Sequence, residues 1–256
     1  MFILSVIRDT IASIGRGAVF MGDVLVCLLK GRVRWGEVFK QVFEQGVRSL
    51  FIVILVSLAS GAVLAMQGRV MMERFGAKEF IAQLVALSLI RELSPIFTAL
   101  VFSGKSGAGM AAELGTMSVN SQIQATRTLG VDPVEFLIVP RILACLIVLP
   151  ILVVISMIVG IFGGYLIGVH EANIPSIYYI NQTIRCISFV DFFTGFVKMF
   201  FFATLISWTC TYKGFFTSGG SMGVGRFTTQ AVAMCYVGVI VSDTILTKII
   251  LTFWGN

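Results

Sequence analysis

Charged residues are scarce in this sequence of 256 residues. Asp, Glu, Lys and Arg make up only 12% of it, against about 25% in an ordinary soluble domain. Apolar residues make up 57%, and the mean hydropathy is +0.96. This balance excludes a soluble globular enzyme, and it excludes a disordered chain, which would need low hydrophobicity and high charge. It predicts an all-α membrane protein that crosses the bilayer several times.

Residues that commonly carry chemistry are scarce as well. The sequence has one histidine, His170, and five cysteines, none of them in a C-x-x-C pair. We therefore expect no metal site, and we interpret the cysteines as small buried hydrophobes. Charges run through the first 30 residues without a small-residue cleavage site, so we expect no cleavable signal peptide. The net charge of +6 is interpreted as basic cytoplasmic loops and not as nucleic-acid binding.

Five long apolar runs predict five transmembrane helices, since about 20 residues cross the hydrocarbon core. Their expected bounds are 49–68, 80–104, 142–169, 192–212 and 227–254. With their connections these spans use the whole length, so we expect a single domain over residues 1–256. If the N-terminus is cytoplasmic, the cytoplasmic segments carry 7, 3 and 2 Lys and Arg residues and the opposite side carries 4. Positive charge accumulates in cytoplasmic loops, which predicts N-terminus inside and C-terminus outside.

Residues 2–30 have a different pattern. Asp9, Arg16, Asp23 and Lys30 recur every seven residues and form one helical stripe. Apolar residues at spacings of three and four lie opposite it, and they include Met21, Leu25 and Leu28. The pattern predicts an amphipathic helix that lies in the membrane interface. The alternative is an imperfect transmembrane helix, which four charges along its length disfavour.

Two charges, Arg91 and Glu92, lie in the middle of the second run, where charge is costly. Neighbouring residues on a helix point about 100° apart, so each should find a partner other than its neighbour. Pro95 leaves the carbonyl one turn earlier without a helical donor. The charges either brace helices or form part of a substrate cavity. Lys198 and Asp243, on the fourth and fifth runs, are candidates for a second such polar feature.

Small residues recur four apart in the third run, at Gly160, Gly164 and Gly168. Such spacing lets helix backbones approach closely in lipid, either within one chain or at a subunit interface. The first run also has a small face, which includes Ser57 and Gly61.

The segment 105–140 is long for a membrane connection and carries its own helix signals. Ser121 and Gln124 fit a capping box, and Gly130 suits the position just after the end of a helix over about 121–129. Asp132, followed by proline, then suits the N-cap of the next helix. An exposed helix on the cytoplasmic side indicates docking to a partner. The alternative is an interfacial elbow without a partner. The nearby stretch Ser103–Ser106 does not fit a P-loop, because the required strand and first glycine are missing.

Several blocks of this sequence resemble the MlaE-type permease family. These blocks are 91–95 (RELSP), 111–117 (AAELGTM), 129–133 (LGVDP), 140–141 (PR), 217–220 (TSGG), 223–225 (GVG), 228–229 (TT) and 254–256 (WGN). The resemblance runs from about residue 40 to the end. Such permeases are the membrane subunits of lipid-transporting ABC systems that work with Mce-domain proteins.

The resemblance implies a permease domain that is not itself an enzyme and works as a homodimer. It implies a cytoplasmic ABC ATPase, which binds the ATP, and a periplasmic Mce-domain protein that binds lipid. The substrate would be phospholipid or a related lipid, held in a cavity between two permeases and moved to or from the Mce partner. The location would be the bacterial inner membrane or, less in keeping with the sequence, the chloroplast inner envelope. No cofactor of the chain itself and no nucleic acid is implied.

Two sets of candidate residues follow. The candidates for the lipid cavity are Leu64, Gln67, Val70, Met71, Arg91 and Glu92. The candidates for contact with the ATPase are Glu113, Gly115, Thr116, Met117, Arg127 and Asp132. We expect Arg91 to approach a lipid phosphate through its planar donor pair, and Glu92 to brace a neighbouring helix. A competing hypothesis is an ion-coupled secondary transporter that uses Arg91, Glu92 and Asp243 as a relay. A lipid-modifying membrane enzyme is a third, although no catalytic motif supports it.

Overall fold

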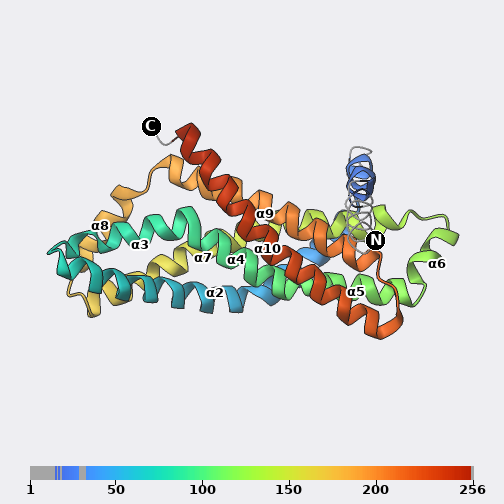
Figure 1. Ribbon diagram of the computed structural model, residues 1–256, viewed down its shortest axis with the longest axis horizontal. Coiled ribbons are helices and arrows are strands. Elements are labelled where there is room, and N and C mark those ends of the chain that lie inside the picture. Colours follow the sequence, from blue (N-terminus) through green and yellow to red (C-terminus); the bar gives the residue numbers. More distant parts are fainter. Residues whose placement is uncertain (1–14, 16, 18, 29–32, 255–256) are drawn as a thin grey trace, which may run out of the picture.

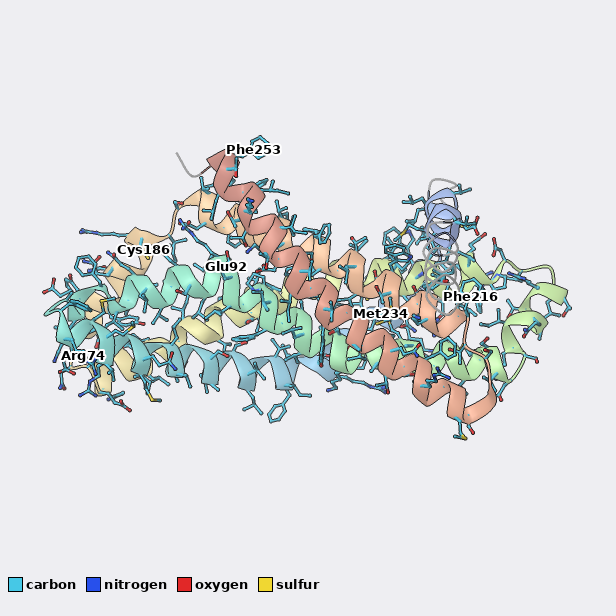
Figure 2. The ribbon with its side chains drawn as sticks, in the orientation of Figure 1. Arg74, Glu92, Cys186, Phe216, Met234 and Phe253 are labelled. Atoms are coloured by element: carbon cyan, nitrogen blue, oxygen red, sulfur yellow. The ribbon has the colours of Figure 1, made fainter. Side chains whose placement is uncertain are left out.

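The computed structural model describes residues 15, 17, 19–28 and 33–254 of the chain. Within these residues the only regular secondary structure is helical, and five helices are long and apolar enough to cross a membrane. The predicted fold class and the five spans are therefore confirmed. The helices form an elongated bundle with one short helix, α8, at one end and another, α6, at the other (Figure 1). Arg74 marks the α8 end, and Phe216 lies toward the opposite end (Figure 2).

The long helices extend well beyond the predicted spans. The elements are α2 (Trp35–Arg74), η1 (Lys78–Phe80), α3 (Ile81–Ser88), η2 (Leu89–Leu93), α4 (Ser94–Phe102), η3 (Ser103–Gly107), α5 (Ala108–Val119), α6 (Gln122–Thr128), η4 (Val134–Ile138), α7 (Val139–His170), α8 (Ser176–Cys186), α9 (Phe189–Phe215) and α10 (Gly220–Trp254). Each predicted span lies inside one long helix. The 40 residues of α2 make a helix of about 60 Å, roughly twice the thickness of the hydrocarbon core. Part of α2 therefore projects out of the membrane.

The second helix does not end at residue 104, where the apolar run stops. It continues without a break from η1 to the end of α5 at Val119, so the first part of the predicted connection 105–140 is helical. The reason is tertiary packing, since Ala111 and Leu114 of α5 are buried against other helices. Gly214 of α9 makes room for this contact, because a Cβ on Gly214 would lie 2.8 Å from the Ala111 carbonyl oxygen.

The helix α6 occupies the predicted place, but its start differs from the expectation. Ser121 has a φ of +57° and makes no capping hydrogen bond, so the predicted capping box is not formed. Gly130, with a φ of +75°, does end the helix. The Gly130 and Val131 N–H groups donate to carbonyls of the last turn at 3.0 and 3.2 Å, which is a Schellman motif. Asp132 Oδ1 then accepts from the Val134 N–H at 2.9 Å, which confirms it as a cap of the next helix.

The described part of the N-terminal segment, Val19–Leu28, is helical and lies across the long axis of the bundle, nearer its α6 end than its α8 end (Figure 1). Phe20, Val24 and Cys27 form its buried face. Phe20 packs on aromatic rings at the end of α9, 5.6 Å from Phe215 between ring centroids. Leu25, on the predicted apolar face, is exposed on the surface of the single chain, as a residue that faces lipid would be. Asp9, Arg16 and Lys30 of the predicted stripe lie outside the described residues.

The small residues of the first and third spans pack against each other within one chain. A Cβ on Gly61 would lie 1.8 Å from the Gly160 carbonyl oxygen, so the two backbones touch. Beside them, the Ser57 hydroxyl donates to Ser156 Oγ at 2.8 Å. Of the two interpretations of these glycines, the packing of helices within one chain is the one observed. The small face of α2 is consequently buried against α7 and does not face a cavity.

Candidate functional site: an intramembrane charge network

The second helix opens into a π-helical turn, η2, at Arg91 and Glu92. The cause is local, because Pro95 has no N–H and cannot donate to the Arg91 carbonyl four residues earlier. Single π turns inside α-helices are frequent at functional sites. The Arg91 carbonyl receives a different donor, the Lys198 ammonium of α9, at 3.2 Å. The backbone defect predicted from Pro95 thus becomes one wall of a polar site inside the bundle.

Arg91 and Glu92 have separate partners, as expected for helix neighbours. Arg91 forms an ion pair and a hydrogen bond with Asp191, near the start of α9. The Asp191 side chain is only 2% exposed, whereas that of Arg91 is 47% exposed. A capping box at the start of α9 also holds Asp191. Its Oδ2 accepts from the Ser188 N–H at 2.9 Å and from the Ser188 hydroxyl at 2.8 Å. Its position is therefore fixed without Arg91.

Lys198 is the centre of the second half of the network. Its side chain is fully buried, and its ammonium forms ion pairs with Glu92 and with Asp243 of α10, the latter at 3.0 Å. It also donates to the Thr247 hydroxyl at 2.7 Å, which in turn donates to the Glu92 carboxylate at 3.3 Å. One cation thus holds two carboxylates from two other helices. Lys198 and Asp243, the two candidates for a second polar feature, are thus in direct contact.

Two cavities flank this network. A cavity of about 630 Å³ is lined by Arg91, Glu92, Asp191 and apolar residues of α9 and α10. A second, of about 520 Å³, lies along α10 and is lined by Glu92, Asp243 and Thr247. Charged groups in hydrocarbon face either a cavity or each other. Both arrangements occur at this site. It offers a half-exposed guanidinium next to apolar walls, which suits a group with a phosphate and a hydrocarbon part.

The lipid-cavity candidates of α2 do not join this site within one chain. No residue of α2 lines either cavity. Gln67, Val70 and Met71 are exposed on the bundle surface, and Leu64 is half-buried near the α3–α8 contact. Because the expected cavity lies between two permeases, the single chain does not test it, and a cavity shared by the α2 residues with Arg91 and Glu92 stays a prediction.

The ATPase-contact candidates lie at the α6 end of the bundle, and most of them are accessible. Glu113, Thr116, Arg127 and Asp132 are exposed, and Met117 is half-buried. Gly115 is buried, and a Cβ there would lie 3.1 Å from Thr217 Oγ1, so Gly115 serves packing and presents no surface.

One accessible candidate of this set, Glu113, already has a partner. It forms an ion pair with the buried Arg141 of α7 at 2.9 Å. Its carboxylate therefore also has a structural role, which a substitution there would disturb.

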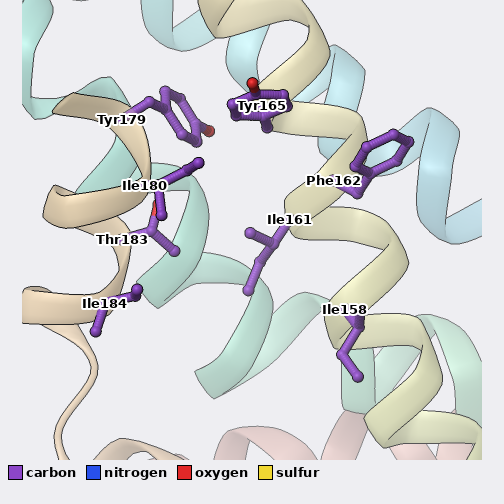
Figure 3. A pocket seen from close by; sticks show the side chains of 8 residues that line it. All are labelled: Ile158, Ile161, Phe162, Tyr165, Tyr179, Ile180, Thr183 and Ile184. Carbon is purple, nitrogen blue, oxygen red and sulfur yellow. The ribbon is translucent and has the colours of Figure 1, made fainter. Parts of the chain in front are cut away.

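A further groove lies between α7 and α8 at the other end of the bundle (Figure 3). It has a volume of about 410 Å³ and walls of isoleucine and aromatic side chains. The hydroxyls of Tyr179 and Thr183 are buried there without a hydrogen-bond partner among the described residues. Burial raises the pKa of Tyr179 above its ordinary value, so its hydroxyl stays neutral. The glycines of α7 make room for its ring, since a Cβ on Gly168 would lie 2.4 Å from it.

Sequence reasoning missed two members of the charge network, Asp191 and Thr247. A signal for Asp191 was present, because a serine three residues before an acid is a capping-box pattern. Thr247 lies four residues after Asp243, on the same helical face. Neither signal identifies the partner, because Glu92 and Thr247 are 155 residues apart in the sequence.

Comparisons with known proteins find relatives along nearly the whole chain. The family model described as Permease MlaE matches residues 38–249. A probable ABC transporter permease protein of Rickettsia typhi is 36% identical over 238 residues, which cover 93% of this chain and 92% of the relative. The intermembrane phospholipid transport system permease protein MlaE of Haemophilus influenzae is 34% identical, with 94% and 93% covered. The chloroplastic protein TRIGALACTOSYLDIACYLGLYCEROL 1 of Arabidopsis thaliana is 33% identical, with 90% and 66% covered.

The family match spans all five long helices and includes every member of the charge network. Its extent leaves only the N-terminal segment and the last few residues outside the family model. The chain is therefore a multi-pass membrane protein that belongs to the MlaE permease family, whose members are membrane subunits of ABC transporters.

Proposed function

We propose that this permease moves phospholipid, or a related lipid, between the bacterial inner membrane and a periplasmic Mce-domain protein. The observation that carries the proposal is the 34% identity, over nearly the full length, to a relative described as a phospholipid transport permease. In this proposal the chain works as a homodimer with its N-terminus in the cytoplasm. A separate cytoplasmic ABC ATPase binds and hydrolyses ATP, so the chain itself needs no cofactor.

The charge network supplies the lipid-binding chemistry in this proposal. Arg91 is half-exposed to a cavity of about 630 Å³, so its free N–H groups can meet a lipid phosphate while Asp191 retains the guanidinium. Glu92, Lys198 and Asp243 hold three helices together behind it. A homodimer would add the exposed α2 surface around Val70 and Met71 as a second wall of the path.

The proposal is tested by transport in reconstituted vesicles. The permease and an ABC ATPase are reconstituted in liposomes that contain a fluorescent phospholipid, and transfer of this lipid to a Mce-domain protein from the same organism is followed. We expect transfer to require hydrolysable ATP and to be unaffected by a protonophore. Transfer that persists without ATP and stops with the protonophore would favour the ion-coupled alternative. In that alternative Glu92 and Asp243, which share the Lys198 ammonium, take up the ion.

The α2 wall is tested by photocrosslinking. A benzophenone amino acid at Met71 should capture lipid acyl chains in the assembled transporter more efficiently than one at Val237. These two side chains are similarly exposed in the single chain, at 63% and 64%, and Val237 on α10 lines none of the cavities described here, so Val237 reports ordinary contact with the bilayer. Equal capture at the two positions would show that the α2 surface does not line the lipid path.

Docking of the ATPase is proposed for the surface of α5 and α6. Arg127 is the cleaner test residue, because it is exposed and has no ion pair among the described residues, whereas Glu113 holds the buried Arg141. Arg127→Glu should reduce copurification of the ATPase and leave the melting temperature of the permease unchanged. Lys40→Ala, an exposed cation on α2, is the control. Unchanged copurification in Arg127→Glu would rule out Arg127 as a contact.

A further inference from the structure

A polar cleft separate from the charge network lies between the N-terminal half of α2 and the segment η3–α5. Its volume is about 370 Å³, and it shares no residue with the cavities around Arg91. Four ionisable side chains line it, namely Glu44, Arg48, Lys105 and Glu113. Nothing in the proposed transport path uses this cleft.

The cleft lies at the membrane surface. Arg48 is the last charge before the uncharged run 49–68, and Lys105 is the first charge after Glu92 in the second helix. The two helices meet at this level, where Ser49 Oγ and Ser106 Oγ are 2.7 Å apart. Cations that flank apolar spans lie among the lipid headgroups. Arg48 and Lys105 therefore lie at headgroup depth on the same side of the membrane.

The polar side chains at the floor of the cleft form hydrogen bonds within the chain, whereas the cations in its walls do not have charged partners among the described residues. Ser106 donates to the Gln45 carbonyl at 2.9 Å, and the Gln45 amide donates to Gln41 Oε1 at 3.1 Å. In the walls, by contrast, Arg48 and Lys105 have no ion pair among the described residues.

The two acids that line the cleft differ in the same respect. Glu44 is without an ion pair among the residues that the structure describes. Glu113 is occupied, because Arg141 holds it at 2.9 Å. The cleft thus presents two free cations and one free carboxylate.

Gly109 keeps this cleft open. It is an exposed helical residue of α5, and a Cβ built on it meets nothing within 4 Å. Glycine is a poor helix former, and here no packing contact within the described chain requires it. A glycine in such a place is typical of close approach by another molecule. This observation is independent of the charges and points to an occupant that lies against the α5 backbone.

We propose that the cleft binds the headgroup of a zwitterionic phospholipid of the phosphatidylethanolamine type. The phosphate lies between Arg48 and Lys105, and the primary ammonium meets Glu44. Arg and Lys are strong phosphate ligands through charge-assisted hydrogen bonds. A primary ammonium has three N–H donors for Glu44, whereas choline has none and a glycerol headgroup leaves Glu44 without a cation. This is a second lipid site, and binding there is measured without transport, so it stands or falls separately from the proposed function.

The test is lipid binding to the full-length permease, purified in detergent and stripped of lipid. Dioleoyl phosphatidylethanolamine and dioleoyl phosphatidylglycerol are titrated and followed by native mass spectrometry. Wild type should prefer the ethanolamine lipid, and Glu44→Gln should abolish this preference. Arg48→Ala or Lys105→Ala should weaken binding of both lipids roughly tenfold, as expected when a charged hydrogen-bond partner is lost. Lys40→Ala, outside the cleft on the same helix, should bind as wild type does.

A steric variant tests the site without changing any charge. Gly109→Phe should fill the cleft and remove the bound ethanolamine lipid, with an unchanged melting temperature and subunit stoichiometry. Free glycerophosphoethanolamine, which has the same phosphodiester and ammonium charges but no acyl chains, should bind only weakly.

Four results would overturn the proposal. They are equal binding of the two lipids to wild type, no loss of binding in Arg48→Ala and Lys105→Ala, free glycerophosphoethanolamine binding as tightly as the lipid, or an altered stoichiometry in Gly109→Phe with lipid still bound. The last would make the cleft a protein interface.

Discussion

Replacing Lys198 by methionine should destabilise the permease more than any other single change in the charge network. Methionine keeps most of the side-chain volume but removes the ammonium. Glu92 and Asp243 would then face each other without a cation, and the Arg91 carbonyl would lose the donor that replaces the missing Pro95 N–H. The side chain of Lys198 is fully buried, so water cannot replace it.

The size of the effect follows from these contacts. Removing one partner of a buried ion pair costs about 3–5 kcal/mol. Because the Glu92 side chain is 34% exposed to its cavity, water can solvate part of its charge, and we expect the lower end, about 3 kcal/mol. For a chain of this size each kcal/mol lowers the melting temperature by about 2–4 °C, which gives a decrease of roughly 6–12 °C.

The assay is thermal unfolding of the purified permease in detergent. Lys248→Met is the matched control, because Lys248 is an exposed lysine on α10 outside the network. Adding Glu92→Gln and Asp243→Asn to Lys198→Met should recover part of the lost stability, since it removes the uncompensated charges. Equal melting temperatures for Lys198→Met and Lys248→Met would refute the reasoning, because the ammonium would then not be holding the two acids.

Two further predictions test the site and the fold. Arg91→Lys and Arg91→Ala should assemble normally, because Asp191 keeps its cap bonds. Transport in vesicles should be highest in wild type, lower in Arg91→Lys and lowest in Arg91→Ala. Undiminished transport in Arg91→Ala would show that Arg91 does not bind the lipid headgroup. Gly61→Val should prevent accumulation of folded protein in membranes, since its Cβ would lie 1.8 Å from the Gly160 carbonyl oxygen. Gly225→Val, where a Cβ has open space, is the control and should accumulate as wild type does. Equal amounts of the two variants would show that the α2–α7 contact can widen without loss of the fold.

The sequence by itself determined the number and order of the membrane helices. Hydrocarbon contains no hydrogen-bonding partners, so a spanning segment must be long, apolar and helical, and the five apolar runs satisfy this without reference to one another. Local signals were equally readable where they depend on near neighbours, as at Gly130, which ends α6, and Asp132, which caps the next helix. The separate partners of Arg91 and Glu92 also followed from helix geometry alone.

Tertiary structure decided which residues meet. Asp191 pairs with Arg91 across 100 residues, and Lys198 joins Glu92 across 106, and no local pattern encodes such pairings. Packing also carried the second helix on to Val119, beyond the end of its apolar run. The sequence predicted that the small face of α2 packs closely against another helix. Only the contact between Gly61 and Gly160 shows that this helix is α7. The physical reason is that periodicity fixes the face on which a side chain lies, whereas its partner depends on how several helices pack at once.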